Sequence, residues 1–239
     1  MINAKVLLVG VGGLGNAVAA VLAQSGLRHL TLVDDDIVDV TNLHRQLLFT
    51  ETDEGAPKIE VAANRLRVEG SPDLELRLVR DRFTPDTAEH LIEGHDLVIE
   101  GADNLATKFL AADACFLAQV PLVQAGVVRW DGWALGWAPQ RGAACLRCVF
   151  EDIPQDRVET CADAGVVGPA VGVVGALQSA IALKLLQHPA TAPTPMWSYS
   201  ALQGRVRRFT PQPRSQCQLC SGEISELKME RYQPPEYAA

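Results

Sequence analysis

A glycine-rich turn follows a short predicted strand near the start of the chain. Residues 5–10, Lys-Val-Leu-Leu-Val-Gly, are typical of a buried strand, and the pattern G-x-G-x-x-G then places glycines at Gly10, Gly12 and Gly15. Such glycines permit a tight turn and let backbone N–H groups approach a phosphate at the positive end of the next helix. Asp34 follows Gly15 by 19 residues, a separation typical of a carboxylate that binds ribose hydroxyls. The segment predicts a nucleotide site, and NAD is the default nucleotide at this stage.

Strands and helices alternate over the first half of the chain. Pro57 suits the first turn of one predicted helix, because a proline there gives up no hydrogen bond. This alternation is typical of a parallel, doubly wound sheet. After the strand at 5–10, the hydrophobic pattern predicts strands over 28–33, 74–79, 96–100 and 121–125, and helices over 17–24, 57–68, 85–93 and 104–119.

The pattern changes after residue 128. Residues 130–133, Trp-Asp-Gly-Trp, predict a turn between antiparallel strands, the second of which ends near Trp137. Residues 197–209 predict one or two further strands. The expected fold class is therefore α/β, a Rossmann-like, doubly wound, mostly parallel sheet extended by antiparallel strands.

A long apolar helix is predicted over residues 171–186. Its small-residue face suits close packing on the sheet or on another subunit. Residues 139–170, before it, are predicted to be irregular. From residue 221 the chain becomes polar, with two adjacent prolines near its end. We expect a single domain over 1–220, followed by a mobile tail over 221–239.

Length and charge argue against several classes of protein. With 239 residues, the chain can form one or two domains with a sizeable core. Its formal net charge is −8, and we expect no nucleic-acid binding, because phosphate binding needs clustered cations. The sequence has no run of about 18 apolar residues and no signal-peptide layout at its start. We therefore expect no membrane span and a cytoplasmic location.

Four of the six cysteines form two C-x-x-C pairs. One pair is Cys145 and Cys148, and the other is Cys217 and Cys220. Two such pairs predict a structural zinc site with four thiolate ligands and no open position for water. The fold must bring the pairs together, since 68 residues separate them. The alternative is a redox-active dithiol in one pair and a chance occurrence of the other. Cys115 is expected to be a buried apolar residue.

Several motifs, in the same order, resemble those of the ubiquitin-activating-type adenylyltransferases, the MoeB/ThiF group. The resemblance extends from Lys5 to Cys220. Dehydrogenases do not combine these motifs with two C-x-x-C pairs. Besides the glycine turn and the cysteine pairs, the motifs are Asp34-Asp35-Asp36, Thr41-Asn42-Leu43-His44-Arg45-Gln46, Gly55-Ala56-Pro57-Lys58, Gly101-Ala102-Asp103-Asn104 and Cys161-Ala162-Asp163-Ala164-Gly165-Val166.

The resemblance implies ATP chemistry on a small carrier protein ending in Gly-Gly. In this family, a C-terminal glycine carboxylate of a ubiquitin-like protein attacks the α-phosphate of ATP, and pyrophosphate leaves. In bacteria the carriers usually supply sulfur for molybdopterin or thiamine synthesis. The resemblance also implies a homodimer.

Three other functions stay open. A related branch of the family could activate a peptide, a small molecule or a tRNA base with ATP. An NAD-dependent oxidoreductase is a second alternative, although it leaves Arg45, Gln46 and both cysteine pairs unexplained. The third is a catalytically silent, zinc-bearing interaction module.

The candidate catalytic residues follow from the charges of the implied reaction. Attack of a carboxylate on a phosphate brings negative charges together, so catalysis needs cations and a metal aimed at the phosphates. Arg45 and Lys58 are the candidate cations. Lys58 is predicted in the first turn of a helix, where the helix dipole disfavours a cation, and this local cost favours a functional role. Asp103 follows a strand at the carboxyl edge of the sheet and is the candidate Mg²⁺ ligand, or else the cap of the next helix.

The motifs imply a larger set of nucleotide-binding residues. Amide side chains in this set are expected to hydrogen-bond the triphosphate or the incoming carboxylate. Asp35 and Asp39 are expected to be solvated acids, and His44 to have no catalytic role. The set is Gly10, Gly12, Gly13, Gly15, Asp34, Asp36, Thr41, Asn42, Leu43, His44, Arg45, Gln46, Lys58, Asp103 and Asn104.

Cys161 is the remaining candidate catalytic residue. In some members of the resembling family, the cysteine at this position forms a thioester or acyl-disulfide with the carrier, and in others it is dispensable. Here it lies in a predicted irregular stretch, where a thiolate can be exposed.

Two departures from the family pattern concern cations. Family members usually carry, before the first strand, a helical segment whose arginine reaches the partner subunit's active site, whereas four residues precede Lys5 here. The family also commonly has arginine where Lys108 stands, and lysine lacks bidentate geometry. We expect catalysis to rest on Arg45 and Lys58 of one chain, with Lys108 as a helper.

Overall fold

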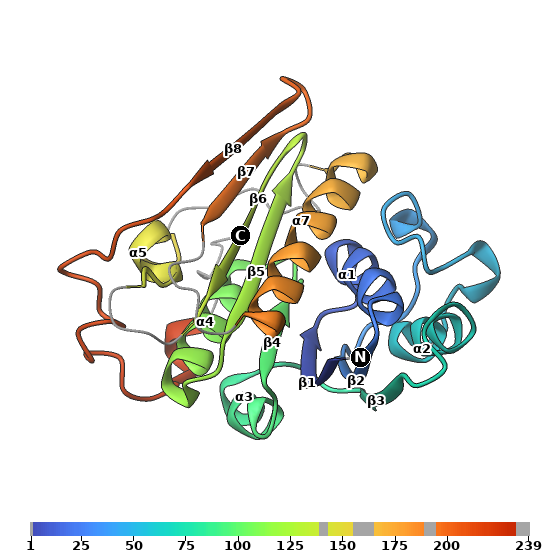
Figure 1. The fold of residues 1–239 in the computed structure, drawn as a ribbon, viewed down its shortest axis with the longest axis horizontal. Helices are drawn as coiled ribbons and strands as arrows, with labels where there is room; N and C mark the ends of the chain where they lie inside the picture. Colours follow the sequence, from blue (N-terminus) through green and yellow to red (C-terminus); the bar gives the residue numbers. More distant parts are fainter. Residues whose placement is uncertain (1, 139–142, 155–164, 189–194, 233–239) are drawn as a thin grey trace, which may run out of the picture.

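The predicted strands form one eight-stranded sheet in the computed structural model, which describes residues 2–138, 143–154, 165–188 and 195–232 (Figure 1). The strand order is β3-β2-β1-β4-β5-β6-β7-β8. The strands are β1 (Ile2–Val9), β2 (Leu27–Val33), β3 (Glu75–Val79), β4 (Leu97–Glu100), β5 (Leu122–Val128), β6 (Asp131–Trp137), β7 (Met196–Ser200) and β8 (Arg205–Phe209).

The sheet is parallel from β3 to β5 and antiparallel from β5 to β8. Val9, at the end of β1, pairs with Val33 of β2 on one side and with Glu100 of β4 on the other. From β1, the chain adds β2 and β3 on one side of the sheet and β4 and β5 on the other. Because the strand order reverses between β1 and β4, a crevice opens beyond the carboxyl ends of these two strands. The predicted fold class is confirmed.

Helices cover both faces of the sheet (Figure 1). One face carries α1 (Gly13–Gln24), α2 (Lys58–Glu69) and α7 (Gly168–Gln187), whose buried side chains form one hydrophobic cluster with the sheet. The other face carries α3 (Pro85–Ile92), α4 (Leu105–Ala118) and α5 (Leu146–Phe150), with a second cluster. Three short 3-10 helices complete the described elements: η1 (Val40–Asn42), η2 (Glu51–Asp53) and η3 (Met229–Tyr232).

Several boundaries differ from the sequence prediction. The first helix begins at Gly13 rather than at residue 17, because the end of the glycine turn is already helical. The turn before β6 is also shorter than predicted, since β6 begins at Asp131, and Arg129 takes the left-handed conformation with φ of 55°. Within the segment predicted to be irregular, the structure has α5 and the start of α7.

The helix α7 packs within the chain through part of its predicted small-residue face. Gly175 and Ser179 are buried, whereas Gly172, Ala176 and Ala180 are exposed. A Cβ atom on Gly175 would lie 2.6 Å from the Cβ of Ala17 on α1, so the two helices are in close contact. By length and composition alone α7 could cross a membrane, but half of it is buried in the protein, and a core helix has the same composition. Contact inside the chain is therefore observed for the Gly175 side of this face, and the side with Gly172 and Ala176 is open to solvent.

The segment after the second cysteine pair is anchored to the protein at two buried residues, although most of its other residues are exposed. Ile224 and Tyr232 are buried in the hydrophobic cluster of the α4 face, and η3 contacts α4. Two buried apolar side chains thus anchor a segment whose polar composition predicted a mobile tail over 221–239. Residues 233–239 lie outside the described residues.

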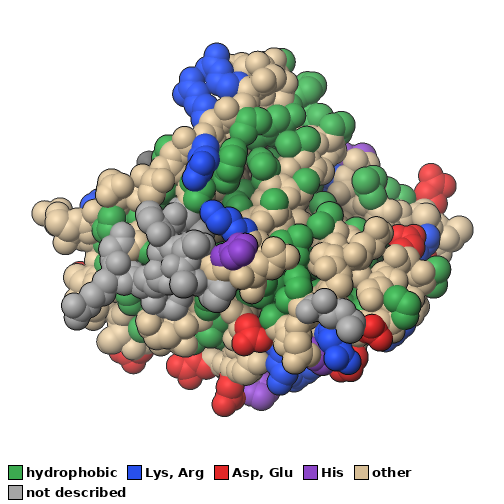
Figure 2. Space-filling view, in the orientation of Figure 1, with side chains coloured by type: hydrophobic (Ala, Val, Ile, Leu, Met, Phe, Trp, Pro, Cys, Tyr) green, Lys and Arg blue, Asp and Glu red, His purple; other side chains and the backbone are tan. Residues whose placement is uncertain are grey.

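The outer strand β8 is basic, and each of its residues is exposed. Arg205, Arg207 and Arg208 account for three of its five residues. Figure 2 shows Lys and Arg side chains gathered over the end of the β7–β8 ribbon. Charged side chains on an edge strand disfavour pairing with the edge of another sheet.

Candidate active site

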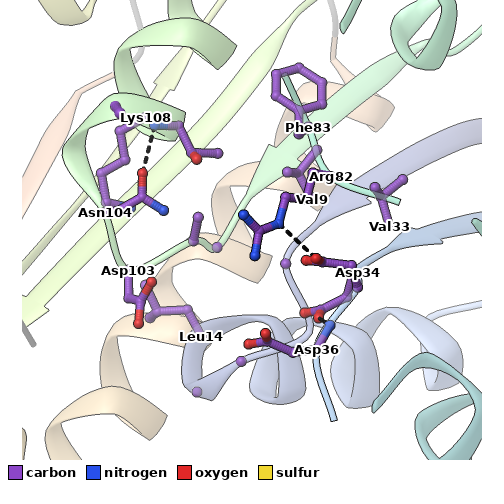
Figure 3. Close-up of a pocket in the computed structure, with 18 of the residues that line it drawn as sticks. Val9, Leu14, Val33, Asp34, Asp36, Arg82, Phe83, Asp103, Asn104 and Lys108 are labelled. Atoms are coloured by element: carbon purple, nitrogen blue, oxygen red, sulfur yellow. Dashed lines mark hydrogen bonds and ion pairs between the residues drawn. The ribbon is translucent and has the colours of Figure 1, made fainter. Parts of the chain in front are cut away.

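A cavity of about 560 Å³ opens where β1, β2, β3 and β4 end, within the usual range of about 300–1,000 Å³ for small-molecule sites (Figure 3). Four predicted nucleotide-binding residues do not line it: Gly15, Thr41, Leu43 and His44. The predicted residues that do line it are Gly10, Gly12, Gly13, Asp34, Asp36, Asn42, Arg45, Gln46, Lys58, Asp103 and Asn104.

The glycine turn is held by backbone conformation and by Asp34. Gly10 has a φ of 86°, a left-handed conformation that disfavours any side chain, and a Cβ on Gly15 would lie 2.0 Å from the carbonyl oxygen of Gly10. The carboxylate of Asp34 accepts hydrogen bonds from the backbone N–H groups of Val11 at 2.6 Å and Asp36 at 2.8 Å. Burial raises the pKa of Asp34, against the opposing effect of these two donors. Asp34 therefore fixes the turn that it lies beside.

The segment around η1 presents Arg45 to the cavity. A guanidinium nitrogen of Arg45 donates to the amide oxygen of Asn42, and another lies 3.2 Å from Nε2 of His44. His44 in turn lies 2.9 Å from the carbonyl oxygen of Thr41, whose N–H and hydroxyl donate to Asp39. These hydrogen bonds from Thr41 lower the pKa of Asp39, with the hydroxyl contributing most. Thr41 and His44 thus help to hold the side chain of Arg45 in position. Asp39 caps η1.

Gln46 lies beside the glycine turn and is buried. Its Nε2 atom is 3.8 Å from where a Cβ on Gly12 would be. Its side-chain oxygen has no hydrogen-bond partner within the part of the chain that the structure describes. An unpaired buried amide is costly, and a polar ligand in the cavity would relieve that cost.

Lys58 is the first residue of α2 and points into the cavity. Its Nζ atom lies 2.8 Å from Oδ2 of Asp36, and its side chain is 6% exposed against 64% for Asp36. The lysine stem is therefore buried, while its partner remains solvated. A cation at this end of a helix is disfavoured by the dipole, and the pair with Asp36 compensates for it.

Asp103 and Asn104 follow β4, and the structure separates their roles. The amide oxygen of Asn104 accepts from the N–H of Thr107 at 2.8 Å, so Asn104 rather than Asp103 caps α4. Among the described residues, the Asp103 carboxylate has no hydrogen bond or ion pair. It lines the cavity and is exposed, so it is available to a ligand.

Three other acids, Asp34, Asp35 and Asp36, have carboxylate oxygens within 4.8 Å of one another. Each of the three is already engaged by backbone N–H groups or by a cation. Of the acids lining the cavity near the strand ends, Asp103 is thus the one best placed to bind Mg²⁺, which prefers a carboxylate with phosphate oxygens.

Lys108 lines the cavity, but its ammonium group is bound by oxygen atoms of the protein. Its Nζ atom donates to both carboxylate oxygens of Glu100, at 3.1 and 3.0 Å, and to the carbonyl oxygen of Ala125 at 2.5 Å. The same carboxylate accepts from the N–H of Ala102 at 2.6 Å, so the pair holds the segment that carries Asp103. The expectation that Lys108 helps neutralise phosphate is not supported, because these bonds use its three N–H donors. We assign it a positioning role.

Arg82 is a cavity residue that the sequence analysis missed. It follows β3 and lines the cavity (Figure 3). Its Nε donates to Oδ2 of Asp35 at 2.7 Å. Asp35, which was expected to be a solvated acid, is partly exposed and paired. No motif surrounds Arg82. It reaches the cavity because β3 lies beside β2. Knowledge of this strand order would have been needed to predict Arg82 as a cavity residue.

The two cysteine pairs come together, as predicted. The Sγ atoms of Cys145 and Cys217 are 3.5 Å apart, and those of Cys148 and Cys220 are 3.7 Å apart. Thiolates on a tetrahedral zinc ion with Zn–S bonds of about 2.3 Å lie about 3.8 Å apart. The cluster is compatible with zinc, and the separations are too long for disulfide bonds. Cys115 is buried, as expected, and its burial raises its pKa.

Cys161 lies outside the described residues.

A buried ion pair lies between the cysteine cluster and the cavity. Arg147, within the first C-x-x-C pair, donates two hydrogen bonds of 2.8 Å to Asp113 and a third, of 2.7 Å, to Asp152. Asp113 also accepts from the hydroxyl of Tyr232 at 2.8 Å. Arg147 and Asp113 are both fully buried, and Tyr232 lines the cavity. These residues were not identified from the sequence.

The start of α7 lies directly against the segment that carries Arg45. A Cβ on Gly168 would lie 2.2 Å from the carbonyl oxygen of His44. One turn later, Val171 is close to the glycine turn, since a Cβ on Gly13 would lie 3.0 Å from Cγ1 of Val171. The helix therefore supports two walls of the cavity.

Comparison with solved structures identifies the fold. MccB of Escherichia coli with ATP has a TM-score of 0.78 at 24% identity, covering 92% of this chain and 68% of that chain. The microcin C7 biosynthetic enzyme MccB with N-formylated MccA has a TM-score of 0.79 at 24% identity, covering 91% and 67%. At this identity, the likeness shows a common fold alone.

Comparison with known sequences identifies the family. The chain is 35% identical over 226 residues to the sulfur carrier protein ThiS adenylyltransferase of Escherichia coli K12, covering 95% of this chain and 89% of that protein. It is 35% identical over 222 residues to the molybdopterin-synthase adenylyltransferase of Salmonella typhimurium, covering 91% and 87%. It is also 37% identical to the adenylyltransferase and sulfurtransferase MOCS3 of Dictyostelium discoideum, but spans 44% of that longer protein. The ThiF family model matches residues 1–220, and this chain therefore belongs to the ThiF family.

Proposed function

We propose that this protein adenylates the C-terminal glycine of a small ubiquitin-like sulfur-carrier protein, using ATP and releasing pyrophosphate. The supporting observation is a cavity that combines a phosphate-binding type of glycine turn with Arg45, Lys58 and the carboxylate of Asp103. The chain is also 35% identical to two named adenylyltransferases over most of its length. Residues 1–220 would form the catalytic domain of a cytoplasmic homodimer.

In the proposed reaction, a carboxylate oxygen of the carrier forms a bond to the α-phosphorus, and the bond from that phosphorus to the bridging oxygen of pyrophosphate breaks. Arg45 and Lys58 neutralise the phosphates, and backbone N–H groups at Gly12 and Gly13 hold them. Asn42 orients Arg45, and Gln46 offers its unpaired amide to the ligand. Asp103 would hold Mg²⁺, which supplies positive charge at the phosphates.

ATP–pyrophosphate exchange tests this proposal. Labelled pyrophosphate is expected to enter ATP when the protein is given ATP, Mg²⁺ and a carrier ending in Gly-Gly. Removal of the terminal glycine from the carrier is the control and should abolish exchange. Carriers of the thiamine and molybdopterin types are tested in parallel, because the relatives named for each are equally identical to this chain. Exchange with free peptides or small acids, but with no carrier, would overturn the proposal in favour of the related branch.

We also propose that Cys145, Cys148, Cys217 and Cys220 hold a structural zinc ion. Elemental analysis should find about one zinc per chain. Changing Cys217 and Cys220 to serine together is expected to remove the metal and lower the unfolding temperature, because four-thiolate sites contribute folding energy. Cys115→Ala is the matched control and should keep the zinc. A zinc-free chain with unchanged stability would contradict the proposal.

Cys161 retains its proposed covalent role in sulfur transfer. Adenylation itself needs no thiol, so that role is separate from the exchange reaction.

A further inference from the structure

The cysteine cluster and the cavity are joined by a buried series of hydrogen bonds. Arg147 stands between Cys145 and Cys148 in the sequence, and its guanidinium donates two hydrogen bonds of 2.8 Å to Asp113 on α4. Asp113 in turn accepts a hydrogen bond of 2.8 Å from the hydroxyl of Tyr232, a residue that lines the cavity. Neither the proposed phosphate-binding residues nor the four thiolates account for this connection.

The second cysteine pair is attached to the same arginine. Arg214, just before Cys217, donates from its guanidinium to the carbonyl oxygen of Arg147 at 3.2 Å, and from its backbone N–H to Sγ of Cys148 at 3.4 Å. The first pair contains Arg147, and the second is bound to its peptide group. The position of Arg147 therefore depends on both pairs.

The segment that carries Tyr232 is held near its two ends. It leaves the cluster at Cys220, and at its far end η3 contacts α4 and Tyr232 donates to Asp113. Between these ends Ile224 is buried, while most of the other residues are exposed. A segment with few buried contacts opens at a low cost in free energy, so its order depends on what holds its ends.

We propose that zinc binding at the cysteine cluster and nucleotide binding in the cavity strengthen each other, with Arg147 and Tyr232 as the positioning residues that couple the two sites. Thiolates bound to one ion fix the loop around Arg147, which holds Asp113, which holds Tyr232 at the cavity wall. Without the ion, this wall loosens. By thermodynamic linkage, a nucleotide that favours the ordered wall raises the affinity for zinc by the same factor. The inference rests on the proposed zinc ion and on ATP as the ligand of the cavity, but not on the carrier.

The test measures the Kd of the full chain for zinc with and without ATP. Zinc is titrated at equilibrium against a competing chelator of known affinity, in excess Mg²⁺. Saturating ATP should lower the Kd for zinc about tenfold in the wild type, within the usual range of about 5–150-fold for coupled sites. In Tyr232→Phe, which keeps the ring, the effect of ATP should fall below about twofold, because the charge-assisted hydrogen bond to Asp113 is lost.

Tyr199→Phe is the matched control. It removes a tyrosine hydroxyl from β7, and Tyr199 does not line the cavity. ATP should lower the Kd for zinc in this variant as much as in the wild type.

Two outcomes would overturn the inference. One is a Kd for zinc that ATP leaves unchanged in the wild type. The other is an equal effect of ATP in the wild type and in Tyr232→Phe, which is expected if ATP merely stabilises the whole folded chain. A wild type that binds no zinc would contradict the zinc proposal and the inference together. Because no carrier is present, coupling without carrier-dependent exchange would remove the proposed reaction and leave the inference standing.

Discussion

Lys58→Ala is expected to lower the rate of carrier-dependent pyrophosphate exchange by about 10²–10³-fold, the usual cost of losing one group that stabilises developing charge. The side chain is almost fully buried, and its Nζ lies 2.8 Å from Asp36 at the charged end of the cavity. Without it, Asp36 would face the phosphates as an uncompensated anion. Steady-state exchange at saturating ATP and carrier measures the effect.

Two further variants distinguish the effect of losing the charge at Lys58 from an effect on folding. Lys58→Arg keeps the charge and should retain part of the activity. Arg67→Ala removes an exposed cation from the other end of the same helix and should leave the rate unchanged. The unfolding temperature of Lys58→Ala should stay close to that of the wild type, because alanine relieves an unfavourable cation at the helix start and Asp36 remains solvated. A wild-type exchange rate in Lys58→Ala would refute the assigned role.

Asp113→Ala is expected to destabilise the protein by about 3–5 kcal/mol, the cost of leaving one partner of a buried ion pair alone. Arg147 has no exposed side-chain surface and would lose two hydrogen bonds of 2.8 Å. Tyr232 would lose its acceptor as well. Denaturant unfolding followed by circular dichroism measures the loss as a shift in the midpoint.

Asp152→Ala is the matched control for this prediction. It removes the other acid paired with Arg147, but the Asp152 side chain is 53% exposed. Asp152 keeps much of its hydration in this pair, and Arg147 keeps its two hydrogen bonds to Asp113, so the expected loss is about 1 kcal/mol or below. Equal stability losses in the two variants would show that Asp113 is not the main counterion of Arg147.

The features that could be predicted from the sequence depend on residues that lie close together in the chain. Gly10 and Gly15 are required by a tight turn. Lys58 was predicted to be functional because a cation in the first turn of a helix is locally unfavourable. The structure brings Gly10 and Lys58 to one cavity, and Gly15 lies against the carbonyl oxygen of Gly10 without lining the cavity. The cysteine pairs were predictable for the same reason, since each pair is itself a local pattern.

The residues that the sequence did not reveal depend on contacts between distant segments. Tyr232 and Asp113 are 119 positions apart, and nothing near either one marks the hydrogen bond between them. Arg82 enters the cavity because of strand order, which a hydrophobic pattern does not specify. Lys108 was misjudged for a related reason. Its position after Asp103 pointed to phosphate, whereas the buried carboxylate of Glu100 holds it.

The contact between Gly168 and the carbonyl of His44 has a consequence for mutational tolerance. A side chain at Gly168 would have to displace either α7 or the segment that carries Arg45, since its Cβ would lie 2.2 Å from that oxygen. Sensitive positions in a saturation-mutagenesis map would therefore not end at the rim of the cavity. They would extend along the first turn of a core helix more than 120 residues downstream, where a substitution that leaves the chain folded could still inactivate it.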